Sequence, residues 1–419
     1  MTEKKRFGNH ASIDPNSDSL EDRWGLKITN VDIFHIGASD YSGSAAWAAN
    51  SIILKLTTSD GLIGFGEAVP TLRTQPVIQS LREVSRVYMG KDPLEVERNW
   101  HEWHRHDFYL PVSFESTTAV SAFDIACWDI MGKHFGAPIH QLLGGAMRSR
   151  IRMYSNGWYD NCVIPEQFAE KAKQVATLGY TALKFDPFGD YYDWIDERGL
   201  KIAHDRVKAV KEATGGKLEL LIEHHGRFNP NSAITIAKSF EEFDPLLMEE
   251  PIHPENIEGL RKYRAATRLR IAVGERILTK EHVATLLAAN LIDFLQADIT
   301  NIGGVTQSRK IAALAESYGV EIAFHNAFGS IQNATTLQLD ASIPNFLVQE
   351  SFYDVFPQWK KLLVRDQLQV ENGYSTVPAR PGIGVEIDER ILEEYAVEGQ
   401  EYFDPAEPVW VVKGTWKSP

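Results

Sequence analysis

The sequence has few cysteines, no long apolar run and no excess of positive charge. Cys127 and Cys162 are its only 2 cysteines, which excludes a disulfide framework and a metal site built from thiolates. A membrane-spanning helix needs about 20 consecutive apolar residues, and no stretch of this chain reaches that length. The net charge of −14 argues against nucleic acid and anionic membranes as partners. A negatively charged substrate must therefore be attracted locally, by a metal ion or by a few Lys and Arg side chains.

The first residues also lack the pattern of a secretory signal. Lys4, Lys5 and Arg6 are not followed by an apolar segment. Residues 1–25 are polar, and we expect a flexible arm there. The chain as a whole has an ordinary globular composition, 43% hydrophobic and 24% charged. We therefore expect a cytoplasmic protein, and a length of 419 residues predicts two domains.

Residues 26–149 are predicted to form an α+β module. Short β-type runs cover 28–34 and 51–57, and the turn Ser59-Asp60-Gly61 leads into a third run at 62–67, which indicates a hairpin. Helical patterning follows at 77–88 and again at 117–135, where apolar residues recur at helical spacing before Gly136-Ala137-Pro138. These elements precede a region of a different kind.

Residues 150–375 alternate between short apolar runs and amphipathic helical stretches. Eight such alternations favour a closed parallel (β/α)₈ barrel, an α/β fold, over an open doubly wound sheet. The predicted strands are 152–155, 182–185, 219–223, 246–249, 271–275, 294–298, 321–325 and 346–350. After residue 375 the pattern returns to turns and short strands, so we expect 376–419 to pack back on the first module.

Three glutamates are the clearest functional signal. Glu223, Glu249 and Glu275 each end an apolar run and stand at equal intervals, close to the length of one strand-helix unit of a barrel. Their carboxylates should therefore meet on adjacent strands at one mouth of the barrel. Three carboxylates without a thiolate suit a hard divalent cation, and we predict one Mg²⁺ per subunit. The alternative is that each glutamate pairs with a Lys or Arg on the rim.

Other predicted strands also end in ionisable residues, which a purely structural barrel does not require. These are Lys184 and Asp186, His225, Asp298, His325 and Glu350. Residues i and i+2 of a strand face the same way. Lys184 and Asp186 should thus point inward together, and so should Glu223 and His225. His224 should not, and Lys184 has the alternative role of neutralising Asp186.

These residue types suit removal of a proton next to a carboxylate. A cation held by three glutamates, with Lys184 beside it, would bind a substrate carboxylate and stabilise the enediolate formed from it. His325 is the candidate base at neutral pH, with Asp298 fixing its tautomer. His225 is the candidate acid for a departing hydroxyl. Glu350 would hydrogen-bond the developing enolate oxygen if it were protonated.

Several sequence segments resemble the enolase superfamily, in particular the mandelate racemase subgroup and its galactonate-type acid-sugar dehydratases. They are 119–145 (AVSAFDIACWDIMGKHFGAPIHQLLGG), Met248-Glu249-Glu250-Pro251, Val273-Gly274-Glu275-Arg276, Gln296-Ala297-Asp298 with Gly303-Gly304-Val305-Thr306, Phe324-His325-Asn326 and Pro381-Gly382-Ile383-Gly384-Val385. The resemblance implies that the first module caps the barrel mouth and that its loop near Tyr41 and Trp47 covers the substrate. It also implies a homo-oligomer, from dimer to octamer.

The chain departs from the subgroup at two positions. Racemases of the subgroup carry Lys-x-Lys on the second strand, whereas this chain has Lys184-Phe185-Asp186 and so lacks the second base. The segment Glu223-His224-His225 resembles the galactonate dehydratase pattern, in which the His two residues after the first metal ligand is the acid. The family has Asp at that first ligand position, where this chain has Glu223.

We therefore predict a hydro-lyase that removes water from a sugar acid of the galactonate, gluconate or arabinonate class and gives a 2-keto-3-deoxy acid. The substrate-binding candidates are Lys184, Asp186, Tyr41, Trp47 and Glu350. One alternative is a racemase, epimerase or cycloisomerase of a hydroxy acid. A second alternative is a barrel that binds ligands without catalysis.

Overall fold

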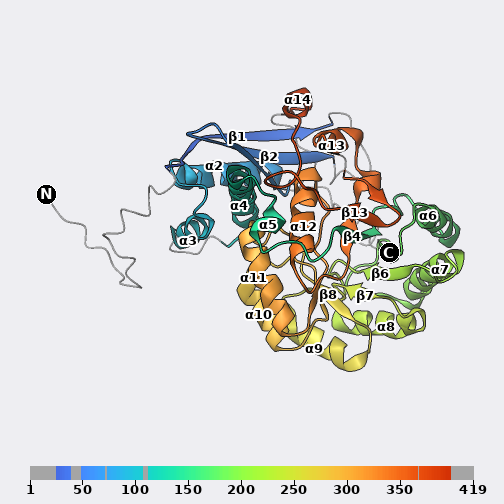
Figure 1. Cartoon of the computed structure of the whole chain (residues 1–419). Coiled ribbons are helices and arrows are strands. Elements are labelled where there is room, and N and C mark those ends of the chain that lie inside the picture. Colours follow the sequence, from blue (N-terminus) through green and yellow to red (C-terminus); the bar gives the residue numbers. More distant parts are fainter. Residues whose placement is uncertain (1–24, 39–48, 71–72, 107–111, 367, 398–419) are drawn as a thin grey trace.

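The computed structural model describes residues 25–38, 49–70, 73–106, 112–366 and 368–397. They form an antiparallel sheet with helices, at the top left of Figure 1, and a barrel beside it. The predicted arm (1–25) lies almost entirely outside the described residues, as do Tyr41 and Trp47.

The first module consists of three strands backed by helices. Strands β1 (Ile28–Gly37), β2 (Asn50–Thr58) and β3 (Ile63–Ala68) pair antiparallel in chain order, and helices α2 (Thr74–Tyr88), α3 (Val96–His106) and α4 (Phe114–Phe135) follow. Helix α4 begins with a reciprocal Ser113–Ser116 cap and ends at Gly136, whose φ of 66° favours glycine. Most of its side chains are buried, because it packs against β3 on one side and near the barrel helix α11 on another.

The second module is the predicted barrel. Its eight strands are β4 (Arg150–Ser155), β5 (Ala182–Phe185), β6 (Glu219–Glu223), β7 (Leu247–Glu249), β8 (Ile271–Val273), β9 (Phe294–Leu295), β10 (Glu321–Ile322) and β11 (Gln349–Ser351). Neighbouring strands from β4 to β10 are parallel, and β11 pairs with β4. A bridge between Ile322 and Phe346 joins β10 to the start of the β11 segment and closes the barrel. The predicted fold class is confirmed, with several strands shorter than expected.

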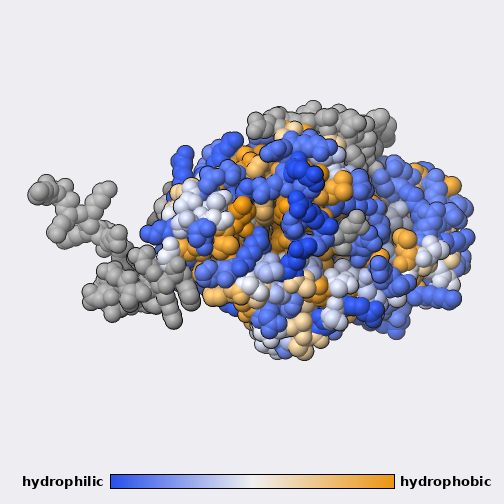
Figure 2. Space-filling view, turned by 45° about the horizontal axis from the view of Figure 1, so that its top comes forward, coloured by the Kyte–Doolittle hydropathy of each residue, from blue (hydrophilic) through white to orange (hydrophobic). Residues whose placement is uncertain are grey.

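Helices cover the outside of the barrel. They are α6 (Pro165–Thr177), α7 (Glu197–Ala213), α8 (Pro230–Phe240), α9 (Ile257–Ala266), α10 (Lys280–Ala288), α11 (Gly304–Ser317) and α12 (Ser330–Ser342). Short helices α5 (Ile139–Leu142), α13 (Gln358–Leu362) and α14 (Glu389–Glu394) lie outside this ring of repeats. Figure 2 shows hydrophilic residues over much of one face, including the area of α6 and α7 at its right. No helix among the described residues has the length and apolar character to cross a membrane.

The end of the described chain returns to the first module. Strands β12 (Val370–Glu371) and β13 (Tyr374–Thr376) form a hairpin against β4. The backbone N–H of Ile383 then donates to Asp129 on α4 at 3.0 Å. Ala396 bridges to Ile36 on β1. The C-terminal segment thus ties the cap sheet and the barrel together.

Glycines allow β3 to lie directly on α4. A Cβ atom on Gly66 would stand 2.0 Å from the carbonyl oxygen of Ala122. Gly66→Ala should therefore force strand and helix apart and lower the free energy of unfolding by about 3 kcal/mol or more. Denaturant unfolding measures the loss. Gly61→Ala is the matched control, since its Cβ meets nothing within 4 Å and its cost is left-handed strain alone, about 1 kcal/mol. Equal losses in the two variants would contradict the packing argument.

Candidate active site

The site residues lie one layer above an apolar plug inside the barrel. The plug consists of one inward side chain from each strand or strand segment: Tyr154, Ala182, Leu221, Leu247, Ala272, Phe294, Ala323 and Val348. The residues two positions further along face the same way. They are Asn156, Lys184, Glu223, Glu249, Gly274, Gln296, His325 and Glu350. The polar layer is therefore a direct consequence of strand alternation, and it lies at the carboxyl ends of the strands, where barrel enzymes have their sites.

Glu223, Glu249 and Glu275 converge. Each offers an oxygen, and these three oxygens lie within 4.8 Å of one another. Glu223 and Glu249 are buried, whereas Glu275 is partly exposed. The inward position on its strand belongs to Gly274, where a Cβ would stand 2.1 Å from the backbone of Gln296.

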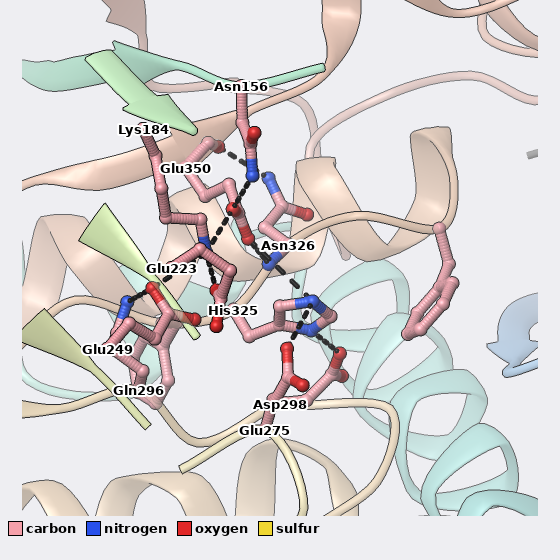
Figure 3. Close-up of polar contacts among 12 residues, drawn as sticks. Asn156, Lys184, Glu223, Glu249, Glu275, Gln296, Asp298, His325, Asn326 and Glu350 are labelled. Atoms are coloured by element: carbon pink, nitrogen blue, oxygen red, sulfur yellow. Dashed lines mark hydrogen bonds and ion pairs between the residues drawn. The ribbon is translucent and has the colours of Figure 1, made fainter. Parts of the chain in front are cut away.

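Lys184 is the cation at the centre of the cluster. Its Nζ lies 2.7 Å from Glu249, 2.9 Å from Glu350 and 3.2 Å from Glu223 (Figure 3). Burial disfavours its charge, but the surrounding carboxylates outweigh that effect and raise the pKa of Lys184 well above its ordinary value.

The pKa values of the two buried glutamates of the triad are shifted in opposite directions. Burial and the charge of Glu223 raise the pKa of Glu249 well above its usual range. Burial also opposes the charge of Glu223, but His225 and Lys184 hold the pKa of Glu223 below its usual range. Oxygen Oε1 of Glu249 is buried without a hydrogen-bond partner. One cationic side chain therefore does not satisfy the whole carboxylate cluster.

His325 and Asp298 form a hydrogen-bonded pair next to Glu275, across the cluster from Lys184 (Figure 3). Nδ1 of His325 lies 2.6 Å from Asp298, and Nε2 lies 3.2 Å from Glu275. Burial disfavours the imidazolium, but Glu275, followed by Asp298 and Glu350, raises the pKa of His325 to about 10. Asp298 thus fixes which nitrogen faces the site, and the negative charge of Glu275 controls its protonation.

His225 stands beside the triad in a different way from the one predicted. Strand β6 ends at Glu223, and His225 has a φ of 53°, so strand alternation does not place it. Its backbone N–H donates to Glu223 at 2.7 Å, and its ring Nδ1 lies 3.1 Å from Asp186. Arg227 donates to the same Asp186 carboxylate at 2.8 Å. A left-handed turn therefore directs the ring towards Asp186.

The structure also bears on the alternative role of Lys184 and on the conditional role of Glu350. Lys184 does not neutralise Asp186, because that carboxylate accepts from Arg227 and lies beside Nδ1 of His225. Burial raises the pKa of Asp186, but Arg227 and His225 outweigh burial and hold that pKa below its ordinary value. Glu350 is also not poised to be protonated. Burial would raise its pKa, but Lys184 and then His325 lower the pKa of Glu350 to about 2. Its predicted role as a hydrogen-bond donor lacks its condition here.

Some members of the site were not predicted as functional. Asn156 donates to Glu350 at 2.8 Å, Gln296 donates to Glu249 at 2.6 Å, and the backbone N–H of Asn326 donates to Glu350 at 2.9 Å. Asn156 and Gln296 stand two residues after the plug residues Tyr154 and Phe294, so the alternation rule applied to every strand finds them. Arg227 has no such signal, because it belongs to a loop.

The buried Lys184 network supports a stability prediction. Lys184→Met should leave buried carboxylates unpaired and cost about 3–5 kcal/mol in chelator-treated protein at pH 7. The pKa of Glu350 is depressed in the folded protein. The contribution of Glu350 to the free energy of unfolding is therefore fully present above the ordinary carboxyl pKa and is lost as pH falls towards 2. The deficit of Lys184→Met should therefore shrink between pH 7 and pH 3. Lys201→Met, which removes an exposed pair with Asp205, should cost at most about 1 kcal/mol. Equal losses in unfolding experiments would contradict the central role of Lys184.

Comparisons with known proteins match both modules. Residues 167–391 match the family described as Enolase C-terminal domain-like, and residues 40–144 match the Mandelate racemase / muconate lactonizing enzyme, N-terminal domain. The chain is 50% identical over 373 residues to a D-gluconate dehydratase of Thermoproteus tenax, covering 89% of this chain and 75% of the relative. It is 44% identical over 390 residues to a D-gluconate/D-galactonate dehydratase of Picrophilus torridus, covering 93% and 99%.

Solved structures give the same result. The crystal structure of a putative dehydratase from Mesorhizobium loti superimposes with a TM-score of 0.83 at 30% identity and covers 88% of this chain and 99% of that chain. A putative mandelate racemase/muconate lactonizing enzyme from Burkholderia has a TM-score of 0.83 at 32% identity, with 90% and 95% covered. On the fold, the ordered motifs and these similarities, the chain belongs to the mandelate racemase subgroup of the enolase superfamily.

Proposed function

We propose that this protein is a Mg²⁺-dependent hydro-lyase that dehydrates a sugar acid, with D-gluconate and D-galactonate as the first candidate substrates. The observation that carries the proposal is the convergence of Glu223, Glu249 and Glu275 between two histidines, His325 and His225. The names of the relatives from Thermoproteus tenax and Picrophilus torridus support the same reaction class and the same substrates.

The three glutamates fit a hard divalent cation. Their oxygens lie within 4.8 Å of one another, and all are carboxylates, the ligands that Mg²⁺ prefers. Oε1 of Glu249 has no hydrogen-bond partner. Burial and the charge of Glu223 raise the pKa of Glu249, as expected where a further carboxylate charge lacks a positive partner. When bound, the cation supplies charge stabilisation for the substrate carboxylate and for the additional negative charge that deprotonation creates. Lys184, already held among the carboxylates, adds a second positive charge on the same side.

His325 is the proposed base for the α-proton. Asp298 accepts from Nδ1 at 2.6 Å and leaves Nε2 facing the site. The pKa of His325 is high because burial is outweighed by Glu275 and the other carboxylates. Neutralising Glu275 lowers that pKa, so His325 becomes an available base once the carboxylate cluster carries its cation.

His225 is the proposed acid for the 3-hydroxyl. Its backbone N–H donates to Glu223. His225 follows β6 and His325 follows β10, four strands further round the eight-stranded barrel, so the two residues come from opposite sides of its mouth. Nδ1 faces the Asp186 carboxylate at 3.1 Å, which leaves Nε2 to deliver a proton to the departing oxygen. A base and an acid on opposite sides of one carboxylate-binding centre are what elimination of water requires.

The alternatives have less support. A two-base racemase needs a second base on β5, and that position carries Asp186, which Arg227 already engages. A barrel that only binds ligands does not explain the buried His325–Asp298 pair beside the acidic triad. Homo-oligomer formation and a cytoplasmic location stay predictions.

The deciding experiment is a screen of sugar acids with Mg²⁺, assayed for 2-keto acid formation. D-gluconate and D-galactonate should give the 2-keto-3-deoxy product. Arabinonate belongs in the same panel because the sequence analysis predicts a substrate of the galactonate, gluconate or arabinonate class. A panel in which no acid loses water, with or without Mg²⁺, would reject the proposed function.

The metal site predicts ligand-dependent stability as well as activity. Mg²⁺ should restore activity to chelator-treated protein and raise its thermal midpoint, because it binds the folded state alone. Glu249→Gln should lose both effects. Glu250→Gln is the matched control: Glu250 is the adjacent buried glutamate but pairs with Arg276, so this variant should keep the Mg²⁺-induced rise. A full Mg²⁺ response in Glu249→Gln would remove this residue from the metal site.

The two histidines should separate the two halves of the reaction. His325→Asn should stop both turnover and exchange of the substrate α-proton with deuterium from the solvent. His225→Gln should slow dehydration by about 10²–10⁴-fold, the usual contribution of a positioned acid, while α-proton exchange and the Mg²⁺ response persist. NMR of the substrate follows exchange and product together. Dehydration by His225→Gln at the wild-type rate would instead favour a racemase or cycloisomerase.

A further inference from the structure

Asp298 is held by an amide from the helix that follows the His325 loop. Nε2 of Gln332 lies 2.9 Å from each oxygen of the Asp298 carboxylate. Thr300 donates to Oδ1 through its backbone N–H at 2.7 Å. Because Gln332 contacts both oxygens, it fixes the plane of the carboxylate, whereas Thr300 holds one oxygen. The plane decides whether Oδ2 points at His325.

The position of Gln332 depends on a residue of the first module. Its backbone N–H donates at 3.0 Å to Glu67, which lies on β3 of the cap sheet. Its side-chain oxygen accepts from the backbone N–H of Phe328 at 2.7 Å. Gln332 is therefore fixed at three points: by the cap through its backbone, by its own loop, and by Asp298.

Helix α12 is shaped to receive Glu67. Its N-cap is Gly329, which has no side chain to accept from the first-turn N–H groups that lack an intrahelical partner. A Cβ on Gly329 would stand 1.8 Å from Oε1 of Glu67. The Glu67 carboxylate thus occupies the place of a capping side chain, and a negative group is favoured at a helix N-terminus.

Glu67 is costly to bury. It is fully buried, and burial raises its pKa although Lys360 and the Gln332 N–H lower it in part. Lys360 is itself buried and donates to the carbonyl oxygen of Phe328. A second buried carboxylate of the cap, Asp129, already ties the cap to the C-terminal segment through Ile383. Module attachment alone therefore does not explain why a carboxylate stands at position 67.

We propose that Glu67 and Gln332 are positioning residues, through which contact of the cap sheet with α12 sets the geometry of the Asp298–His325 pair. The inference rests on the proposed function for the role of His325. Loss of the Glu67 contact releases the first turn of α12, and Gln332 moves with it. The Asp298 carboxylate, still held at Oδ1 by the N–H and the hydroxyl of Thr300, then rotates about that oxygen. The α-proton is then removed more slowly, while the carboxylate-binding side of the site stays intact.

Enzyme kinetics on the Mg²⁺-loaded full chain test this coupling. Gln332→Met removes the amide, and it should lower kcat and the rate of α-proton exchange together by about 10–100-fold, the usual effect of losing an outer-shell partner. Glu67→Gln keeps the shape of the side chain and should lower kcat by about 10-fold, the lower end of that range. The value of KM should change little in both variants. Asp129→Asn is the matched control, a buried cap carboxylate without contact to α12, and its kcat should stay at the wild-type value even if its thermal midpoint falls.

The double variant distinguishes positioning from mere stability. If Glu67 acts through Gln332, then Glu67→Gln should change kcat by less than about twofold in a Gln332→Met background, although the two losses of thermal stability add. Additive losses in log kcat, or an equal loss of kcat in Asp129→Asn, would overturn the proposal. Gln332→Met keeps the backbone contact of residue 332 to the cap, so this variant tests the proposal by itself if Glu67→Gln does not fold.

A crystal structure of Gln332→Met gives a readout that needs no substrate. The distance between His325 Nδ1 and Asp298 Oδ2 is 2.6 Å in the wild-type protein and should lengthen beyond hydrogen bonding. An unchanged distance would refute the positioning role. A wild-type protein inactive on every sugar acid would refute the proposed function instead. The crystallographic distance would still show whether Gln332 positions Asp298 or only stabilises the fold.

Discussion

The structure depends on the burial of many carboxylates around one lysine. Glu223, Glu249 and Glu350 all contact Lys184, and each is almost fully buried. Isolated carboxylates do not survive such burial as anions, because desolvation costs several kcal/mol for each ion. Lys184 compensates part of the charge, and the remaining excess would favour the divalent cation proposed for the site. The stability problem and the proposed chemistry therefore have one origin.

The barrel solves the geometric part of this problem. Its apolar plug closes the interior below the site, and strand alternation then requires the next inward position on each strand to face the mouth. That layer combines anions, a cation and amides. The cap sheet reaches α12 through Glu67, and the C-terminal segment holds the modules together through Asp129 and the β1 contacts. Lys184, Glu223, Glu249 and Glu350 lie within strands β5, β6, β7 and β11, so the hydrogen-bonded sheet sets where these four side chains begin.

Much of this arrangement was predictable from the sequence, because it depends on local rules. Equal spacing of Glu223, Glu249 and Glu275 with apolar runs before them predicts adjacent parallel strands, and the structure brings these three residues together. The Asp298–His325 contact follows in the same way from neighbouring strand ends. What failed was reasoning beyond the ends of strands. His225 is left-handed, so alternation does not apply to it, and the partner of Asp186 proved to be Arg227, a loop residue that no periodic pattern marks.

The contacts that the sequence did not reveal are those made across long separations. Glu67 and Gln332 meet although 265 positions separate them, and each alone resembles an ordinary buried polar residue. A barrel strand fixes where a catalytic side chain begins, but its final orientation depends on the groups that surround its tip. For His325 these groups come from another strand, from α12 and, through α12, from the cap. Attachment of the cap is thus more than a cover for the barrel mouth: it completes the hydrogen-bond network that orients the proposed base.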